Sequence, residues 1–307
     1  MTVLPAEAAL GTHDVENQPG APEAADLWAA DPALRDAVAA QRGDAGAVEA
    51  FAAAFAPGHV RVAARAAERH PPEMRLFDRA GRRLDEVAYH PGYHLLMRLG
   101  AEKGYAARPW EDAPGGHVAH AAMVYLLSQV EPGVCCPLTM TYAAVPALAA
   151  DPALAEVWRP KLVARVYDPS VAPVAEKAGA TLGMAMTEKQ GGSDVRANAT
   201  RAERDGEHYR LTGHKWFCSA PMSDGFLTLA QAEGGLTCFL VPRWLEGARN
   251  GIRLMRLKEK LGNRANASAE IEYDRALAFR LGEEGAGVRT ILEMVHHTRL
   301  DTAMAPA

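Results

Sequence analysis

The pattern of the sequence changes near Thr181. Before this residue, long Ala-rich segments carry apolar side chains at helical spacing, as in HVAHAAMVYLLSQV (117–130). After it come short strand-like runs such as FLTLAQ and LTCFLVP, separated by turn pairs such as Asp205-Gly206 and Gly234-Gly235. This change predicts an α+β chain in which helices precede an antiparallel β-sandwich or a β-barrel-like domain.

Three parts are expected from these patterns. Residues 1–180 would form a helical N-terminal domain, with Asp31 as a candidate helix N-cap and a small hairpin around Gly81. Residues 181–282 would form the barrel-like middle domain, and residues 283–307 would begin a second helical region. One stripe of that last helix carries apolar residues, namely Val288, Ile291, Leu292 and Val295. Such a stripe must pack on the earlier helices, on another subunit, or on a segment outside this chain.

Composition narrows the class of protein. The chain has 307 residues, of which 49% are hydrophobic, and a net charge of −5, so it can bury a core and carries no overall charge that favours nucleic acid or an anionic membrane. No apolar run approaches the roughly 18 residues of a membrane span, and the N-terminus lacks a signal-peptide pattern. The four cysteines have no CxxC spacing, which favours reduced, buried thiols in a cytoplasmic protein. They are Cys135, Cys136, Cys218 and Cys238.

A small polar cluster, MTEKQGGSDV (186–195), interrupts the apolar texture. Gly191 and Gly192 permit backbone conformations that bring main-chain N–H groups close to an anion, and Thr187 and Ser193 add hydroxyl donors. This geometry could hold a long ligand with a polar ring at one end and a pyrophosphate at the other. The alternative is a turn between strands whose polar side chains satisfy backbone groups. On these residues alone the two interpretations are about equally favoured.

A second segment, GHKWFCSA (213–220), places Trp216 and Phe217 beside Ser219. A flat aromatic side chain with a hydroxyl nearby suits a planar conjugated ring. The alternative, and the more common case, is an ordinary aromatic residue of a β-core.

Taken together, these two segments in a β-domain flanked by helices resemble the motifs of the acyl-CoA dehydrogenase flavoproteins. Further segments, including CPLTMTYAA, YRLTGHKWF, LKEKLGNRANAS and HHTRLD, resemble the AidB-like, alkylation-response branch of that family. The resemblance runs from about residue 70 to the end. It implies a helical N-terminal domain, a β-barrel-like middle domain and a C-terminal four-helix bundle, with FAD between the last two.

The resemblance also implies a set of flavin contacts. Thr187 and Ser193 would be foremost in the first motif, and Phe217 would lie against the isoalloxazine. The full set of implied cofactor-binding residues is Met184, Ala185, Met186, Thr187, Glu188, Gly191, Gly192, Ser193, Phe217, Cys218 and Ser219. We expect Cys218 to have a packing role, and we do not expect Glu188 to be a catalytic base.

The resemblance leaves this chain without a catalytic residue that we can name. The family's usual catalytic Glu would lie in a C-terminal bundle that we expect to be mostly absent here. Isovaleryl-type relatives carry the Glu just before an Arg on the first bundle helix; here that Arg resembles Arg299, and Thr298 precedes it. A Thr hydroxyl is not a base at neutral pH. We therefore expect a truncated chain in which α,β-dehydrogenation of an acyl thioester is impaired, and homo-oligomers only where the bundle is present.

Other interpretations compete with this one. Three His pairs could suggest a metal, but no carboxylate set completes a site; they are His90 and His94, His117 and His120, and His296 and His297. The basic segment 249–264 could contact nucleic acid, although its alternation favours a strand with one solvated basic face. The chain could thus be a flavoprotein of the DNA-alkylation response that binds nucleic acid without turnover. It could also be an inactive fragment that needs a separate bundle.

Overall fold

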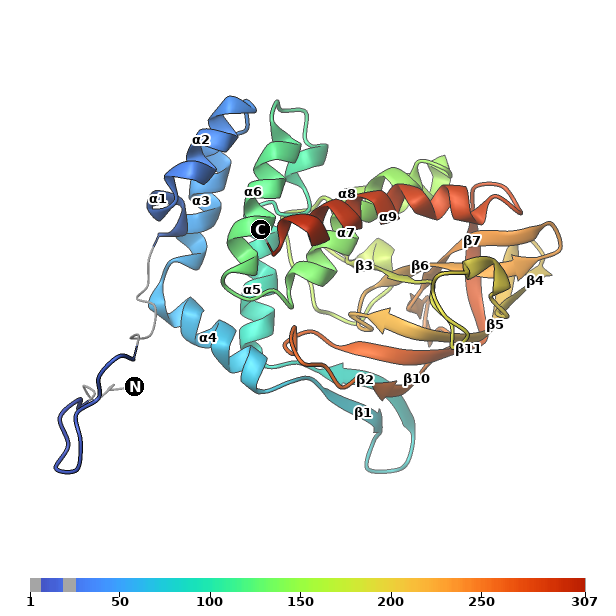
Figure 1. The fold of residues 1–307 in the computed structure, drawn as a ribbon. Helices are drawn as coiled ribbons and strands as arrows, with labels where there is room; N and C mark the ends of the chain where they lie inside the picture. The colour runs from blue at the N-terminus through green and yellow to red at the C-terminus, as the bar shows by residue number, and fades with distance from the viewer. Residues whose placement is uncertain (1–6, 19–25, 307) are drawn as a thin grey trace.

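The protein consists of a helical end and a β-rich end, joined along one central helix (Figure 1). The structure is a computed structural model, and it describes residues 7–18 and 26–306. Three short 3-10 turns accompany the helices. The α-helices are α1 (Leu27–Ala30), α2 (Pro32–Ala40), α3 (Ala45–Phe55), α4 (Gly58–Arg69), α5 (Pro91–Glu102), α6 (Gly116–Ser128), α7 (Cys135–Leu148), α8 (Pro152–Leu162) and α9 (Gly287–Met304).

Several helices begin at an aspartate that caps exposed backbone N–H groups. Asp31 accepts a hydrogen bond from the Leu34 N–H at 2.8 Å at the start of α2, which confirms the predicted N-cap. Asp44 and Asp151 do the same for α3 and α8. A proline follows Asp31 and Asp151 directly, where its missing N–H has no helical partner to lose.

A two-stranded hairpin, β1 (Glu73–Phe77) and β2 (Arg83–Ala88), projects from the helical end and confirms the turn predicted around Gly81. It is attached to the β-rich end by hydrogen bonds at Leu254. The Arg83 guanidinium donates to the Leu254 carbonyl at 2.8 Å, and the Leu254 N–H donates to Asp85 at 2.8 Å. The hairpin therefore joins the two ends of the molecule on the side away from α9 (Figure 1).

The β-rich end is one seven-stranded sheet in the order β10-β11-β5-β4-β6-β3, with β7 pairing to both β11 and β6. Most neighbours are antiparallel, as predicted, but β6 pairs in parallel with β3 and, at one residue pair, with β4. Strands β3 and β6 can run in the same direction because β4 and β5, and not a hairpin turn, connect them. A separate short ribbon is formed by β8 (Trp244–Leu245) and β9 (Ala248–Arg249). The strands of the sheet are β3 (Leu182–Ala185), β4 (Arg201–Asp205), β5 (His208–Ser219), β6 (Gly225–Ala232), β7 (Gly235–Pro242), β10 (Ile252–Leu257) and β11 (Ser268–Leu281).

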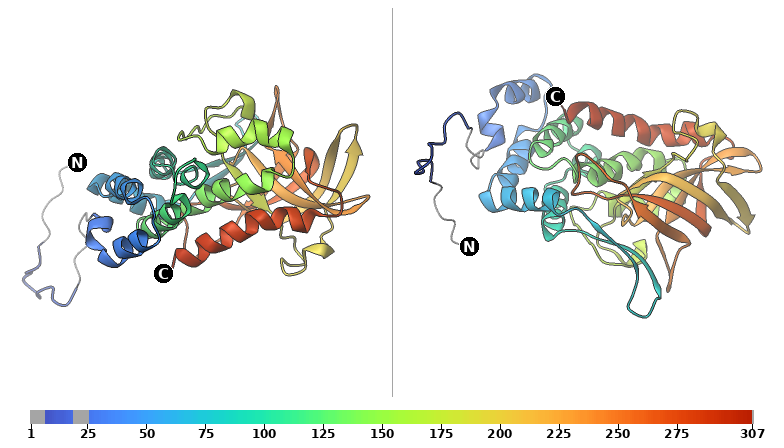
Figure 2. Two further views of the ribbon diagram at one scale, coloured as in Figure 1. Left: turned by 90° about the horizontal axis from the view of Figure 1, so that it is seen from above. Right: turned by 60° about the horizontal axis from the view of Figure 1, so that its bottom comes forward.

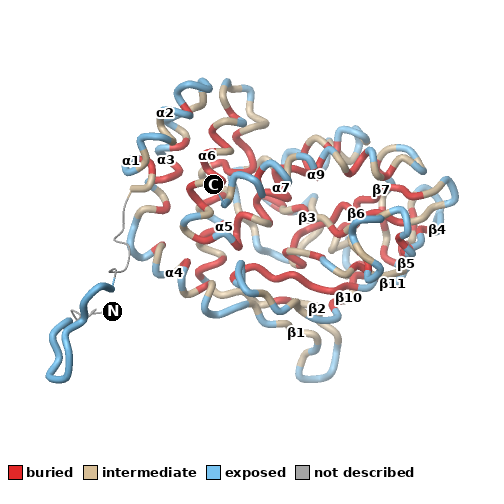
Figure 3. The backbone as a smooth tube through the Cα atoms, viewed as in Figure 1, coloured by how far each residue is buried: buried red, intermediate tan, exposed pale blue. Residues whose placement is uncertain are grey.

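Helix α7 lies at the centre of the molecule and is buried over nearly its whole length (Figure 3). It is apolar on all sides, as expected of a helix with partners on every face. Helix α9 packs along it and reaches α6 and β7, and both views of Figure 2 show it lying lengthwise beside the other helices. Ile291 and Val295 of the predicted stripe are buried there. This half of the stripe thus packs within the chain, on α7 and β7, whereas Val288 and Leu292 stay part-exposed and line an open hollow. Within the described residues, no helix is both long and apolar enough to cross a membrane.

Candidate functional site

The side chains of β3 point alternately to the two faces of the sheet, and this separates the first group of predicted residues. Met184 and Met186 point toward α7 and pack on the cluster of apolar side chains that α7 and α9 share. Ala185, between them, is fully buried in the other cluster, inside the sheet. Consecutive residues of one predicted contact segment therefore face opposite sides of the strand, and only alternate side chains can meet a common ligand.

Strand β5 contains a β-bulge at the second predicted segment. Two of its residues, Trp216 and Phe217, stand opposite the single residue Glu270 of β11. Lys215 before the bulge and Cys218 after it are both fully buried. Phe217, by contrast, is turned outward and remains 47% exposed. The bulge thus directs an aromatic side chain away from the core, and the buried Cys218 has the packing environment that we expected for it.

The two motifs contact each other through the backbone and through an ion pair. The Trp216 N–H donates to the Thr187 carbonyl at 2.7 Å. Directly beneath, the Lys215 ammonium donates to the Glu188 carboxylate at 2.7 Å, and both side chains are 0% exposed. Residues separated by about 28 positions in the chain are therefore fixed relative to one another, on the rigid edge of a sheet.

Glu188 is saturated with hydrogen bonds. Besides Lys215, its carboxylate accepts from the N–H groups of Ala199 at 2.6 Å and Thr200 at 3.2 Å. Burial alone would raise the pKa of Glu188, but the bonds from Lys215 and Thr200 outweigh it, and the pKa is lowered. Burial in turn lowers the pKa of Lys215. Glu188 is thus an ionised structural carboxylate with no oxygen turned to a cavity, as expected of a residue that is not a base.

The glycines after Glu188 form a tight turn over Thr187. Gly191 has φ +130°, which favours glycine, and its N–H bonds to the Glu188 carbonyl at 3.1 Å. A side chain at Gly192 would place its Cβ 2.8 Å from the Thr187 hydroxyl. Ser193 is exposed, and Asp194 caps a short turn by accepting from the Arg196 N–H. None of Gly191, Gly192 and Ser193 lines the cavity described next.

A cavity of about 430 Å³ lies between this edge of the sheet and the helices α7 and α9. Five of the predicted residues line it: Met184, Met186, Thr187, Phe217 and Ser219. Ala185, Glu188 and Cys218 lie behind the same wall. The opposite wall comes from the helices and from two loops, and includes Cys136, Thr139, Met140, Asn263, Thr298 and Asp301.

Asp301 on α9 supplies a carboxylate to this cavity that the sequence patterns did not single out. It accepts from the Thr139 hydroxyl at 2.6 Å and lies 2.9 Å from His120 Nε2, while His120 Nδ1 is 2.8 Å from the Tyr105 carbonyl. Both ring nitrogens of His120 therefore face acceptor oxygens, those of the Tyr105 carbonyl and the Asp301 carboxylate. Three partners from α6, α7 and α9 meet here. The available signal was the acid in HHTRLD, one turn after His297 and Thr298 on the same side of the helix.

The paired histidines have structural partners rather than metal-ligand geometry. His117 and His297 both hydrogen-bond the Tyr142 hydroxyl, at 3.1 and 2.8 Å. Trp110 stacks on Tyr142 beside them. Over the part of the chain that the structure describes, no group of three or more His, Cys, Asp or Glu side chains could hold a metal ion.

The basic segment 249–264 folds as β10 and the loop after it, and its charges are largely paired. Arg253 contacts Asp274 at 3.1 Å, and Arg256 and Lys258 share Glu270 at 2.6 and 2.7 Å. This pairing favours the interpretation as a strand with one solvated basic face over a phosphate-binding patch.

Comparison with known proteins identifies the family of this chain. Residues 17–169 match the family described as "Adaptive response protein AidB N-terminal domain", and residues 183–276 match "Acyl-CoA dehydrogenase, middle domain". The chain is 46% identical to the putative acyl-CoA dehydrogenase AidB of Escherichia coli over 301 residues, which cover 95% of this chain and 56% of that protein. The chain belongs to the acyl-CoA dehydrogenase family, in its AidB-like branch. FAD is the cofactor of this family.

Solved structures agree with this assignment. The Caenorhabditis elegans acyl-CoA dehydrogenase ACDH-11, in complex with C11-CoA, superposes with a TM-score of 0.84 and 31% identity, covering 98% of this chain and 53% of that one. A glutaryl-CoA dehydrogenase of Mycobacterium smegmatis in complex with FADH2 shares the fold, with a TM-score of 0.62 and 18% identity over 90% of this chain and 61% of that one. The chain spans about half the length of the curated relatives that it matches.

Proposed function

We propose that this chain binds FAD in the cavity between β3, β5, α7 and α9, as the flavin-facing part of an AidB-like acyl-CoA dehydrogenase. One observation carries the proposal. The β-bulge and the Trp216–Thr187 hydrogen bond together turn Thr187, Phe217 and Ser219 toward one cavity. These are side chains of the two segments whose resemblance to flavin motifs was noted from sequence alone.

The residues present fit a flavin. Phe217 offers a half-exposed flat ring that no core requirement explains, and a planar conjugated ring can stack on it. Thr187 and Ser219 supply hydroxyl donors to the cavity, and the polarizable side chains of Met184 and Met186 supply apolar contacts. When bound, FAD supplies the acceptor for a hydride. The protein's contribution is to fix that ring on a sheet edge and to exclude water from one of its faces.

We propose an acyl thioester as the substrate class, with the α7–α9 wall as its side of the cavity. The complex of ACDH-11 with C11-CoA supports this class. The described residues of the cavity wall include one carboxylate, Asp301, and its hydrogen bonds to Thr139 and His120 assign it to holding α7, α6 and α9 together. The hydroxyl of Thr298, the residue before Arg299, is not a base at neutral pH. We therefore expect FAD binding by this chain, and little or no α-proton abstraction by it.

Reconstitution with FAD tests the proposal. The purified chain is titrated with FAD while visible absorption and the thermal unfolding midpoint are followed. We expect flavin bands that remain with the protein after gel filtration and a concentration-dependent rise in the midpoint. Thr187→Val and Ser219→Ala should each weaken FAD binding about tenfold, in line with about 1.5 kcal/mol for a lost hydrogen bond. Thr212→Val, on the exposed face of β5, is the matched control and should leave binding unchanged.

Absence of both flavin bands and any FAD-dependent shift would refute flavin binding by this chain. An acyl-CoA added to the reconstituted protein without oxygen should bleach the flavin slowly or not at all. Rapid bleaching would contradict the absence of a base and would direct attention to Asp301, whose Asp301→Asn variant would then have to abolish it.

A further inference from the structure

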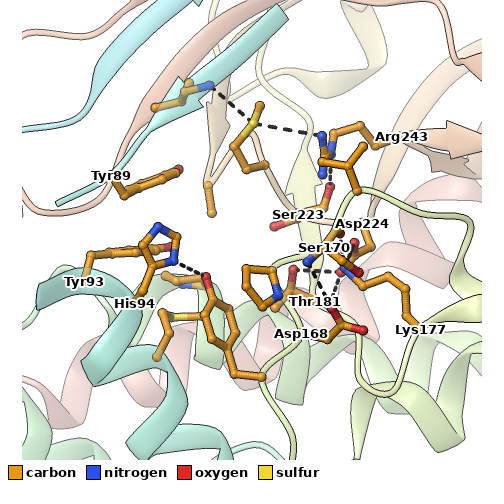
Figure 4. Close-up of a pocket in the computed structure, with 18 of the residues that line it drawn as sticks. Tyr89, Tyr93, His94, Asp168, Ser170, Lys177, Thr181, Ser223, Asp224 and Arg243 are labelled. Carbon is orange, nitrogen blue, oxygen red and sulfur yellow. Dashed lines mark hydrogen bonds and ion pairs between the residues drawn. The ribbon is translucent and has the colours of Figure 1, made fainter. Parts of the chain in front are cut away.

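A second cavity lies on the other side of the N-terminal end of α7, away from the candidate flavin cavity. Its volume is about 230 Å³, and its walls come from β2, α5, the loop 167–177 and the turn that precedes β6 (Figure 4). The two cavities share no lining residue. This volume is below the usual range for cofactor sites and suits a ligand of about ten non-hydrogen atoms, so FAD or coenzyme A would not fit.

Arg243, just after β7, brings a positive charge to this cavity without a direct ion pair. Its Nε donates to the Ser223 carbonyl at 3.0 Å, and Nη1 makes a long contact of 4.0 Å with the Met222 sulfur (Figure 4). It forms no ion pair with any carboxylate of the described residues. Partial burial accordingly lowers the pKa of Arg243, even though nearby acids oppose the change. A guanidinium has five N–H donors, so most of its capacity is unused.

The acids around the cavity are already engaged elsewhere. Asp224 holds the Lys177 ammonium at 2.6 Å and the Thr181 N–H at 2.8 Å. Asp168 accepts from two backbone N–H groups of its own loop, at 2.9 and 3.0 Å. Glu86 lies 3.5 Å from Arg249. Each of these acids therefore has a direct partner other than Arg243, and no carboxylate of the described residues forms an ion pair with its guanidinium.

Two hydroxyls in the same walls also lack partners. Ser223 is 3% exposed, and its Oγ has no hydrogen-bond partner among the described residues; the same holds for the Tyr89 hydroxyl. A buried hydroxyl without a partner costs about 1–3 kcal/mol. The Ser223 carbonyl accepts from Arg243, so the unpartnered hydroxyl belongs to a residue that the guanidinium contacts.

The facing wall is flat and aromatic. The rings of Tyr89 and Tyr93 stack with centroids 4.1 Å apart, and His94 meets both of them edge-on. His94 is held in place by a 2.7 Å hydrogen bond between its Nδ1 and the Tyr167 hydroxyl. In Figure 4 these rings lie across the cavity from Arg243, Ser223 and Asp224. One side of the cavity therefore suits an apolar ring or chain, and the other suits an anion.

We propose that this second cavity binds a small organic carboxylate with a flat apolar body. The carboxylate would pair with the Arg243 guanidinium and accept from the Ser223 hydroxyl, and the body would lie against Tyr89 and Tyr93. A carboxylate matches the fork of an arginine in two parallel hydrogen bonds, which satisfies donors that the protein leaves unpaired. This site is separate from the proposed flavin function and does not depend on it.

Phenylacetate and its neutral isostere phenylacetamide are the probes that test the charge requirement. Each is titrated into the full chain by isothermal calorimetry, with protein-detected NMR as a second readout. We expect phenylacetate to bind at least tenfold more tightly than phenylacetamide. Arg243→Gln should remove this preference, whereas Arg249→Gln, a neighbouring arginine outside the cavity lining, should retain it. Ser223→Ala, a milder change, should weaken phenylacetate binding several-fold.

Three outcomes would overturn the proposal. The first is equal affinity for the acid and the amide, and the second is no binding of phenylacetate at millimolar concentrations. The third is binding that FAD displaces, or that survives Ser223→Ala and Arg243→Gln unchanged, since this would place the probe elsewhere. The comparison of the two probes uses the unaltered chain, so it remains decisive even where a variant fails to fold.

Discussion

Each of the two cavities has a buried lysine–carboxylate pair beside it, and the two pairs differ in what surrounds them. Lys215 and Glu188 stand behind the candidate flavin cavity, with neither side chain exposed and neither in its lining. Lys177 and Asp224 are also buried, yet both line the second cavity. The ammonium-to-carboxylate distances are close, 2.7 and 2.6 Å. Two ion pairs of nearly equal length are therefore fully enclosed in one place and form part of a cavity wall in the other.

The pKa directions express this difference. Two backbone N–H groups and Lys215 lower the pKa of Glu188 in spite of its burial. For Asp224, burial is the stronger influence and raises the pKa, although Lys177 and the Thr181 N–H oppose it. Each carboxylate accepts three hydrogen bonds, one of them from a lysine, so the balance between burial and these bonds, and not their number, sets the direction of the pKa.

The largest effect is expected from Lys215→Met. This change leaves the Glu188 charge buried without its counter-ion, and we expect a loss of about 3–5 kcal/mol in the free energy of unfolding, measured by urea denaturation. Adding Glu188→Gln should recover part of the loss, since the unpaired charge is then gone. The matched control is Lys189→Met at an exposed neighbouring position, with an expected change of about 0.5 kcal/mol or less.

Asp224→Asn should cost less, about 1–3 kcal/mol in the same measurement. The Lys177 ammonium keeps its 2.8 Å bond to the Ser170 carbonyl and stands at a cavity wall, where water can solvate it. The amide of the new side chain can still accept from the Thr181 N–H. A loss of unfolding free energy as large as that of Lys215→Met would contradict the proposed difference between the two pairs.

The two acids should also give opposite pH dependence. The lowered pKa of Glu188 adds stability that is full above the ordinary value of 4.5 and is lost as pH falls through the folded-state pKa. The raised pKa of Asp224 acts in the reverse sense, because the folded state takes up the proton first as pH falls toward 3.8. Below about pH 4.5, the stability advantage of the unaltered chain should shrink against Glu188→Gln, and as the pH falls toward 3.8 it should grow against Asp224→Asn. Parallel curves for the two variants would contradict both assignments.

The smallest effect is expected from Thr181→Val. The Thr181 hydroxyl contributes only a 3.3 Å bond to Asp224, while its backbone N–H, at 2.8 Å, is unchanged by the substitution. The expected loss is about 0.5–1 kcal/mol. Chemical denaturation measures this loss. A smaller loss for Thr181→Val than for Asp224→Asn would support the view that backbone groups provide most of the hydrogen bonding to that acid.

Local sequence patterns were sufficient for much of the fold and for one wall of the site. The Asp31 cap, the hairpin around Gly81 and the alternating strands depend on residues close together in the chain, so the pattern specifies them. The side-chain alternation of β3 is of the same kind. Glu188 was expected among the cofactor contacts, but it lies buried behind the cavity wall, and the motif alone did not reveal Lys215 as its partner.

What the sequence could not reveal depends on distant neighbours. Asp301 meets His120 across 181 positions, and Arg243 is conspicuous only because no carboxylate of the described residues forms an ion pair with it. The parallel pairing of β3 with β6 follows from a crossover whose path no local pattern records. The bulge at Trp216 and Phe217 likewise depends on a count of residues in β11, a different strand.

That bulge has a consequence for how β5 tolerates change in length. Because two residues occupy the place of one, the inside–outside phase of the strand differs before and after Trp216 and Phe217. Deleting either of them would restore an unbroken ladder and keep both Lys215 and the residues after Cys218 opposite their present partners. The sheet would persist, and the one aromatic residue left would alternate with the buried Lys215 and Cys218. Deletion of Phe217 would therefore keep the register of the sheet and leave Trp216 alone at the outward position, so that the strand would lose one of its two aromatic rings without losing its pairing.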